Sequence, residues 1–381
     1  MFAVSGFCLA SVNMKLLRQT LLIVAALLVV TLGPEKLFAS SVDKPRVTVP
    51  TNLPPDDPRD VKTLLQYWGP KRVTTDGDGN VTEIAADQGN LVNNPELRLA
   101  LSRLRHVRSL ACYGSKRDSG ILATIAAWPS LKNISLDDTF GDDDLRNLEP
   151  LQSLLCVNIY SDQITDSAFG RLAKLKNLIA VTIGSAKIDG SGLNALSGLK
   201  KLGTLCLRNC RLDDEGMKNL KGMQLQTLDL QSPAITDRGI DAIKGMTTLR
   251  TLYISDAALT DRAFGPIANI KGLSSLLIIN SPKIDGSGLK ELSALKQLET
   301  LNLSRCHIND EGVKNLKGLR LKRLNLGFTE ITDRAIDEIK DMTSLETVYL
   351  AGTRTTKAAI FEKLKGIKGL KIGRVPIEEL Q

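Results

Sequence analysis

The segment Asp76-Gly-Asp78-Gly-Asn80 carries side-chain oxygens at alternate positions, as the start of a calcium-binding loop does. Such a loop needs glycine at its sixth position and a bidentate glutamate at its twelfth, where this chain has Val81 and Asp87. The same residues suit a tight turn between strands at 72–75 and 81–84. We therefore expect a β-hairpin here, with calcium binding as the alternative.

Cysteine and histidine side chains do not form a recognisable catalytic or metal-binding set. The six cysteines are scattered, and His106 and His307 are far apart in the sequence. No paired carboxylates, nucleophile motif or phosphate-binding loop stands out either. We therefore expect no enzymatic activity, no cofactor and no metal.

Composition narrows the class of protein further. The chain has 381 residues, of which 43% are hydrophobic but only 4% aromatic, so aliphatic side chains must fill the core. This length and the few cysteines exclude a small disulfide-stapled fold. The net charge of +8 comes from 50 basic and 42 acidic residues that are well mixed along the chain. Because a nucleic-acid footprint needs clustered basic residues, we expect no nucleic-acid partner.

The N-terminal residues read as an export signal. Lys15 and Arg18 precede an apolar run at 21–32, which is short for a membrane span and typical of a signal peptide. We assign residues 1–39 to a signal peptide or an uncleaved anchor. This segment is the one part of the chain that we expect to contact a membrane. Met14 is an alternative start. Residues 40–56 contain several prolines and predict an extended linker.

A helix is predicted at 57–68, with Val61, Leu64 and Trp68 on one face. Together with the hairpin it forms an N-terminal cap, residues 57–106.

From Val107 onward the sequence repeats a unit of 23 to 25 residues. In the copy that begins at Leu202, leucines at positions 1, 4 and 6 alternate as in a short strand with one face inward. A Thr-Asp pair, as at Thr236, then precedes a stretch with helical periodicity, so each unit is predicted to be strand, turn and helix. Eleven units span residues 107–369, and a C-terminal cap spans 370–381. They begin at Val107, Leu131, Leu154, Leu178, Leu202, Leu225, Leu249, about Leu273, Leu298, Leu321 and Leu345.

A longer period is also present, because two stretches recur 96 residues apart. Asp214-Glu-Gly-Met-Lys-Asn-Leu-Lys-Gly222 recurs as Asp310-Glu-Gly-Val-Lys-Asn-Leu-Lys-Gly318. This pattern indicates that four units were duplicated as a block.

The unit L-x-x-L-x-L-x-x-C-x-L resembles the leucine-rich repeats, and most closely the cysteine-containing type of exported bacterial proteins, whose turn reads I-T-D-x-G-L. The match covers roughly residues 81–372. This resemblance implies an α/β solenoid with a curved parallel sheet on the concave face and helices on the convex face. It also implies a non-enzymatic scaffold that binds another macromolecule.

Positions 3, 5 and 7 of every unit are predicted to face outward on the concave surface. They are mostly small polar residues with spaced tyrosines and sparse charges, a composition typical of binding surfaces. Cys206 is outward and could be a reactive thiol. Cys210 and Cys306 are predicted inward, buried, and about 19 Å apart, too far for a disulfide.

The eighth unit has one extra residue and two possible strand registers. Alignment with the copy 96 residues earlier places Leu277 and Ile279 inward and leaves Leu276 and Ile278 outward. A shift by one residue would exchange them. The predicted partner-binding residues are Tyr253, Ile278 and Leu276 as apolar anchors, with Arg208, Asp229 and Tyr160 as polar or aromatic contacts.

A protein is the expected partner of this surface. A cell-surface polysaccharide is one alternative. Another is an intracellular role as a substrate receptor of the ubiquitin-ligase type, although no F-box-like helical segment precedes the repeats.

Overall fold

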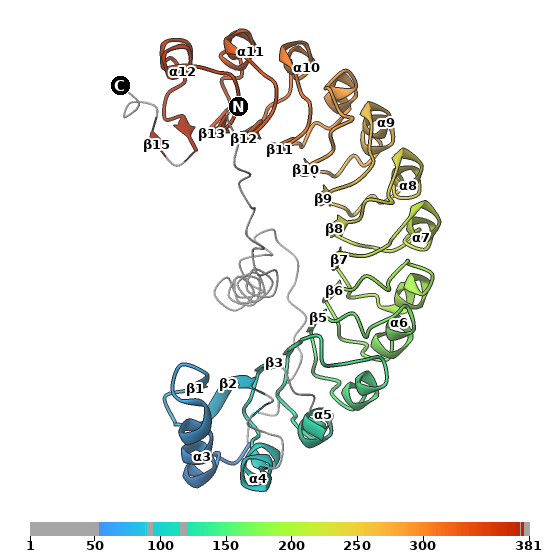
Figure 1. Cartoon of the computed structure of the whole chain (residues 1–381), viewed down its shortest axis with the longest axis vertical. Coiled ribbons are helices and arrows are strands. Elements are labelled where there is room, and N and C mark those ends of the chain that lie inside the picture. The colour runs from blue at the N-terminus through green and yellow to red at the C-terminus, as the bar shows by residue number, and fades with distance from the viewer. Residues whose placement is uncertain (1–52, 88, 90–93, 115–119, 374, 377–381) are drawn as a thin grey trace, which may run out of the picture. The chain divides into compact units, whose positions relative to one another are not determined.

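The structure is a computed structural model that describes residues 53–87, 89, 94–114, 120–373 and 375–376 (Figure 1). The predicted signal peptide or anchor at 1–39 and most of the predicted linker lie outside the described residues. No helix in the described ranges is both long and apolar enough to cross a membrane.

One continuous sheet runs through the described residues, and its 15 strands follow one another in sequence order (Figure 1). Successive strands from β2 to β14 pair in parallel, whereas β1 and β15 pair antiparallel at the two ends. The strands are β1 Val73–Thr75, β2 Val81–Asp87, β3 Ser109–Tyr113, β4 Asn133–Leu136, β5 Cys156–Tyr160, β6 Ala180–Gly184, β7 Thr204–Arg208, β8 Thr227–Gln231, β9 Thr251–Ser255, β10 Ser275–Ile279, β11 Thr300–Asn302, β12 Arg323–Asn325, β13 Thr347–Tyr349, β14 Lys371–Ile372 and β15 Val375–Pro376.

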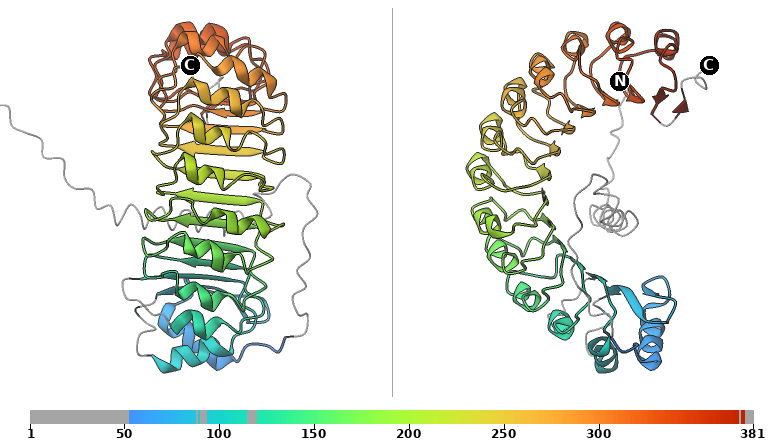
Figure 2. Two further views of the ribbon diagram at one scale, coloured as in Figure 1. Left: turned by 90° about the vertical axis from the view of Figure 1, so that its right-hand side faces the viewer. Right: turned by 180° about the vertical axis from the view of Figure 1, so that it is seen from behind.

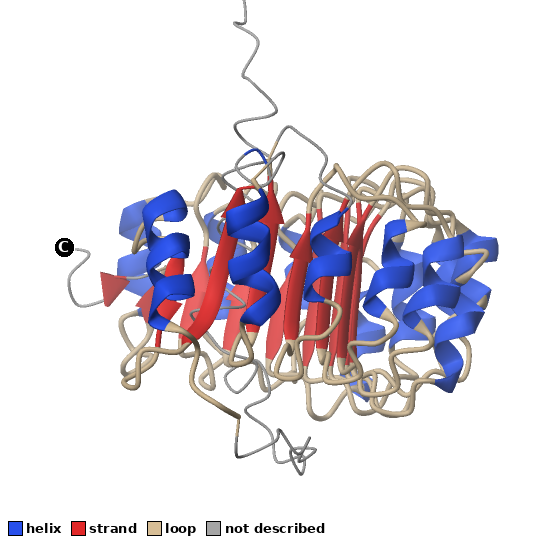
Figure 3. Ribbon diagram, turned by 90° about the horizontal axis from the view of Figure 1, so that it is seen from below, coloured by secondary structure: helices blue, strands red, loops and turns tan. Residues whose placement is uncertain are grey.

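Short helices cover the opposite side of each unit, so the strands line the concave side of an arc (Figures 1 and 2). Figure 3 shows the two layers, with the strands side by side and the helices outside them. The α-helices are α3 Pro58–Trp68, α4 Pro95–Arg103, α5 Gly120–Ile125, α6 Ser167–Leu172, α7 Asp214–Lys218, α8 Asp237–Asp241, α9 Phe264–Ile267, α10 Asp310–Lys314, α11 Asp333–Ile339 and α12 Lys357–Leu364. The 3₁₀ segments are η2 Asp144–Leu148, η3 Leu193–Gly198, η4 Asp261–Ala263 and η5 Leu289–Ala294.

The core is a single seam formed by the inward side chains of successive strands. Leu205 pairs in register with Leu228, which pairs with Leu252. All three side chains are fully buried, as is Leu301 in a later unit. Each unit leaves its inward leucines open on two sides, so burial depends on the neighbouring units, and the array must form as a stack.

The turns before the helices tie each unit to the next. Thr236 caps α8 by accepting a hydrogen bond from the backbone N–H of Arg238, as predicted. Asp237 has a different role, because it accepts hydrogen bonds from the N–H and hydroxyl of Thr260 one unit later, at 2.8 and 2.6 Å. The same kind of bond joins Thr236 to Asp214, Thr332 to Asp310 and Thr356 to Asp333, so a carboxylate links the turns of these neighbouring units.

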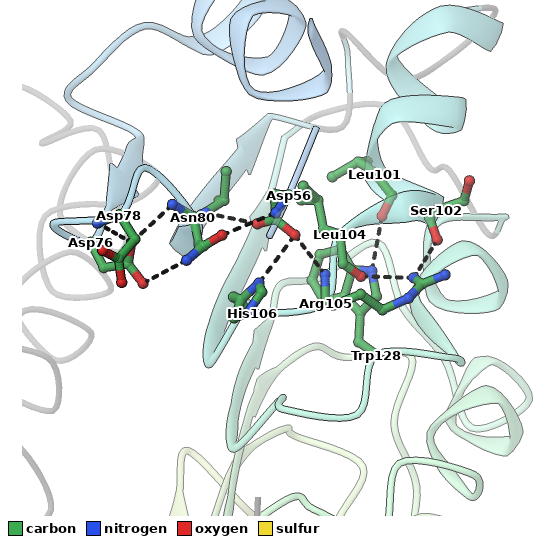
Figure 4. A network of polar contacts seen from close by, with 11 residues as sticks. Asp56, Asp76, Asp78, Asn80, Leu101, Ser102, Leu104, Arg105, His106 and Trp128 are labelled. Atoms are coloured by element: carbon green, nitrogen blue, oxygen red, sulfur yellow. Dashed lines mark hydrogen bonds and ion pairs between the residues drawn. The ribbon is translucent and has the colours of Figure 1, made fainter. Parts of the chain in front are cut away.

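The N-terminal cap is closed by a buried aspartate. Asp56 accepts hydrogen bonds from the N–H groups of Val81 and Arg105, at 2.9 and 3.0 Å, and lies 3.3 Å from His106 Nδ1 (Figure 4). Its own N–H donates to the side-chain oxygen of Asn80. The side chain of Asp56 is buried, so the packed cap includes this residue. The sequence predicts instead that it lies in the extended linker at 40–56.

Candidate functional site on the concave sheet face

Four of the six predicted site residues come together on adjacent strands. Tyr160 on β5 lies opposite Gly184 on β6, which in turn pairs with Arg208 on β7. Asp229 on β8 pairs with Tyr253 on β9. Because all of these positions alternate with buried aliphatic residues, they share the outward face of the sheet.

The centre of this group is an ion pair between Arg208 and Asp229. Arg208 donates from Nε and Nη2 to Asp229 Oδ2, the first at 3.1 Å. The aspartate side chain is 9% exposed and the arginine side chain 41% exposed. Burial raises the pKa of Asp229 above its usual value, and the positive charge of Arg208 partly opposes that shift. The arginine therefore pairs with a mostly buried carboxylate while its own side chain stays partly exposed to solvent.

Two tyrosines flank the ion pair. A Cβ at residue 184 would lie 2.6 Å from Tyr160 Cδ1, so the ring of Tyr160 occupies the space above Gly184. On the other side, the guanidinium carbon of Arg208 lies 5.9 Å from the ring centroid of Tyr253, within cation–π range. These contacts fix the orientation of both rings before any partner arrives.

The predicted outward placement of Leu276 and Ile278 is wrong. Both side chains are fully buried and pair with the inward residues Leu252 and Ile254 of β9. Leu277 takes the outward position instead and pairs with Tyr253. The partly exposed side chains of Leu277 and its neighbour Ile279 therefore supply the apolar surface expected there.

The error came from the position of the extra residue in the eighth unit. The spacing from Leu273 to Leu276 equals that from Leu249 to Leu252, so the strand begins in the usual register. The extra residue falls after the strand, where Asn280 adopts a left-handed conformation with φ of 55°. Alignment with the earlier copy placed the extra residue before the strand, which shifts the strand by one residue and exchanges its two faces.

We define the concave cluster as Tyr160, Gly184, Arg208, Asp229, Tyr253 and Leu277, one residue from each of the strands β5 to β10.

Cys206 lies beside the cluster but does not have the properties of a reactive thiol. Burial raises its pKa to about 12, and the nearby carboxylate of Asp229 acts in the same direction. A nucleophilic cysteine needs a lowered pKa, because the thiolate is the reactive form. The raised pKa therefore argues against reactivity at Cys206. Cys210 and Cys306 are buried free thiols, as predicted.

The calcium candidate is a hairpin turn between β1 and β2. Asp76 Oδ1 accepts hydrogen bonds from the N–H groups of Asp78 and Asn80, at 3.0 and 2.9 Å (Figure 4). The Asn80 side chain donates to the other carboxylate oxygen of Asp76. The bond from the Asn80 N–H is the largest of several that lower the pKa of Asp76. Over the described ranges, no group of three or more histidine, cysteine or acidic side chains is arranged to hold a metal ion.

Comparison with known proteins agrees with this geometry. A family profile described as a leucine-rich repeat matches residues 296–317, which span the start of one predicted unit and its strand, turn and helix. The repeating unit is a leucine-rich repeat. Together with the parallel sheet and outer helices, this match makes the described array a leucine-rich-repeat solenoid.

Solved structures with similar folds include two internalins of Listeria monocytogenes. The internalin inlF is 19% identical, with 83% of this chain and 93% of that chain covered and a TM-score of 0.48. For internalin C2 the values are 22%, 61%, 92% and 0.41. A TLR13–ssRNA13 complex is 18% identical, with 73% of this chain and 41% of that chain covered and a TM-score of 0.47. No curated protein sequence matches the chain.

Sequence reasoning missed two contributors to the cluster in the leucine-rich repeats. Gly184 is not among the predicted site residues, although a glycine opposite an outward tyrosine indicates space for the ring. Leu277 was assigned to the wrong face, although the unchanged spacing of the leucines before it gives the register. Both signals were present in the sequence, but each depends on which residue of the neighbouring strand lies opposite.

Proposed function

We propose that this leucine-rich-repeat array is a non-enzymatic scaffold that binds another protein through the concave cluster. The observation that supports this proposal is the juxtaposition of a fixed ion pair, two oriented tyrosines and an outward leucine on adjacent strands. Protein interfaces combine such aromatic, arginine and apolar anchors with a polar surround.

The surround of the cluster has the composition that such an interface needs. Thr251 and Ser275 lie on the same face as Tyr253 and Leu277, one outward position before them. Small polar side chains of this kind occupy little space and can form hydrogen bonds with a partner. The sheet also fixes the positions of all these side chains, so binding costs little ordering of the scaffold.

We also propose that the protein is exported to the cell envelope or beyond, with residues 1–39 as signal peptide or anchor. The basic residues before the apolar run at 21–32 support this role. Mass spectrometry of the protein from the native host's envelope fraction tests it. A mature N-terminus near residue 40, or an intact anchor in the membrane pellet, is the expected result; an intact N-terminus in the cytosol contradicts it.

Site-specific photo-crosslinking tests the binding face. A photoreactive amino acid at position 277 should give covalent adducts with a protein from the envelope fraction. The same amino acid at Lys218, an exposed residue of the convex helix α7, is the matched control and should not. Adducts from both positions, or from Lys218 alone, contradict the proposal. A carbohydrate adduct at 277 would instead support the polysaccharide alternative.

The partner identified in this way allows a quantitative test. Tyr253→Ala and Leu277→Ser should each lower its affinity at least tenfold without changing the thermal unfolding midpoint. Unchanged affinity in both variants would remove the concave cluster as the binding site.

A further inference from the structure

Phe328 is an exposed aromatic residue in a backbone conformation that phenylalanine rarely adopts. It follows β12 with φ of 57°, and the residue is 55% exposed. The left-handed region brings Cβ close to the backbone, so a bulky residue there is a strained outlier. Strain that persists at an exposed position points to a functional role for the side chain.

The other units that share this left-handed turn show which residues it favours. Asn209, Asp256 and Asn280 adopt φ of 52°, 56° and 55°, and Gly352 adopts 73° in the unit after Phe328. Asparagine, aspartate and glycine are the residues that tolerate this conformation best. Phe328 and its predecessor in the row, Arg305 with φ of 60°, are the two residues without that tolerance.

Arg305 and Phe328 contact each other. The guanidinium carbon of Arg305 lies 4.6 Å from the centroid of the Phe328 ring. On the following unit, a Cβ at Gly352 would overlap Phe328 Cδ1, so the ring fills the space that this glycine leaves. The N–H of Phe328 donates to the carbonyl of Ala351 at 2.8 Å. The ring is therefore held in place between an arginine and a glycine while much of it stays in contact with solvent.

A second exposed ring comes from the adjacent hydrogen-bonded segment. Tyr349 occupies an outward position of β13 and is 41% exposed. Its carbonyl accepts a hydrogen bond from Leu326, two residues before Phe328. In the described units, these two rings are the large apolar side chains that are most exposed.

The charge on the outward strand positions beside the two rings has one sign, and the exposed carboxylate of Glu330 lies in the turn two residues after Phe328. The outward positions of the described strands β11 to β14 carry Arg323 and Lys371 and no carboxylate. Arg305 adds a further positive charge next to Phe328. A partner with negative charge beside an apolar group complements both features.

We propose that Arg305, Phe328 and Tyr349 form a docking site for a peptide segment that carries an aromatic or aliphatic side chain next to a carboxylate. The apolar side chain packs on the Phe328 and Tyr349 rings, and the carboxylate pairs with the guanidinium of Arg305. Arg305 lies in the unit next to that of Leu277, and Phe328 and Tyr349 lie in the two units beyond it. The proposed site shares no residue with the concave cluster, so substitutions can test the two surfaces separately.

A random peptide library displayed on phage and panned against the full chain tests this specificity. The selected peptides should combine an aromatic or aliphatic residue with aspartate or glutamate within two positions. A synthetic peptide of the enriched sequence should bind at least tenfold more weakly to Phe328→Asn and to Arg305→Asn than to the unmodified chain.

Phe328→Asn separates binding from folding. Asparagine occupies the same turn position at 209 and 280, so the variant should unfold at the same temperature as the unmodified chain or higher. Tyr253→Ala in the concave cluster is the matched control and should leave peptide affinity unchanged. Failure to enrich peptides, enrichment of peptides without carboxylates, unchanged affinity in both asparagine variants, or loss of affinity in Tyr253→Ala would each overturn the proposal.

Discussion

Residues 202–272 and 298–368 are two copies of one stretch of the array, and their inward and turn residues make the same contacts. Thr236 donates to Asp214 in the first copy as Thr332 donates to Asp310 in the second, with N–H to oxygen distances of 2.8 and 2.7 Å. Cys210 and Cys306 are buried to a similar degree, and burial raises the pKa of each to about 11.

The outward residues of the two copies have diverged. Arg208 and Asp229 form the ion pair of the concave cluster, whereas the second copy has Ser304 and Asn325 in their places. Asn325 accepts a hydrogen bond from the nearby Gly327 N–H, so its side chain folds back on its own turn. Tyrosine is kept at 253 and 349.

This contrast distinguishes the inward positions, which stabilise the array, from the outward positions, which are free to vary. An inward side chain must fill a fixed volume between two neighbouring units, so a change of shape costs packing energy in both. An outward side chain has solvent on one side and can change at small cost. The outward positions are therefore where one copy can acquire a binding property that the other lacks.

The largest effect is expected from the inward residues, and it should be equal in the two copies. Leu205→Ala and Leu301→Ala each remove a fully buried side chain from the seam. Each should lower the free energy of unfolding by about 2–5 kcal/mol in urea denaturation. A clear loss in one copy with no loss in the other would contradict the equivalence of the two cores.

Removal of Arg208 should have an intermediate effect that its counterpart does not share. Arg208→Ala leaves the Asp229 carboxylate mostly buried without its cation, which should cost about 1–3 kcal/mol of unfolding free energy, because the partly exposed arginine allows water to replace it in part. Ser304→Ala should change stability by less than about 0.5 kcal/mol. The double variant Arg208→Ala, Asp229→Asn should recover most of the loss; if it is as unstable as Arg208→Ala alone, the unpaired carboxylate is not the cause.

The ion pair also predicts a smaller, pH-dependent difference. Burial raises the pKa of Asp229 above its usual value of 3.8, so the folded state holds this proton more tightly than the unfolded chain does. The stability contributed by that proton is complete below pH 3.8 and is lost as pH rises through the raised pKa. The stability of the unmodified chain relative to Asp229→Asn should therefore fall as pH rises across this window.

Urea denaturation of both proteins at a series of pH values measures this difference. Arg208→Ala should move the window to higher pH, because the arginine opposes the shift. A relative stability that increases with pH would mean that the pKa of Asp229 is lowered instead.

The smallest expected effect is at Cys206, where the second copy has Asn302. With a pKa raised to about 12, only about one thiol in ten thousand is ionised at pH 8. Mass spectrometry of the peptide that contains Cys206 should therefore show almost no alkylation in the native protein and full alkylation after denaturation. Rapid alkylation of the native protein would contradict the raised pKa of Cys206.

The sequence predicts the seam and the helix caps well because both depend on local patterns. Leu228 and Leu301 could be assigned inward from their spacing alone, and Thr236 could be assigned as a cap from its place before a helix. The role of Asp237 could not be predicted in this way, because its hydrogen-bond partner Thr260 lies in the next unit. The residues adjacent to Asp237 in the sequence indicate only that it begins a helix.

The parts of the candidate site that sequence reasoning could not give depend on pairing between strands. Arg208, Asp229 and Tyr253 could each be placed on the outward face, but their contacts follow from the register of β7, β8 and β9. At 276–279 an insertion left two registers open, and the pairing of Leu276 with Leu252 and of Leu277 with Tyr253 decides between them.

An exchange of outward residues between the copies tests the central claim most directly. Arg208→Ser combined with Asp229→Asn gives the first copy the side chains that the second already carries on the same scaffold. The account predicts that this variant folds with an unfolding midpoint close to that of the unmodified chain, and that its affinity for the partner crosslinked at position 277 falls at least tenfold. Unchanged affinity in the folded double variant would contradict the claim that the outward residues of this copy determine binding.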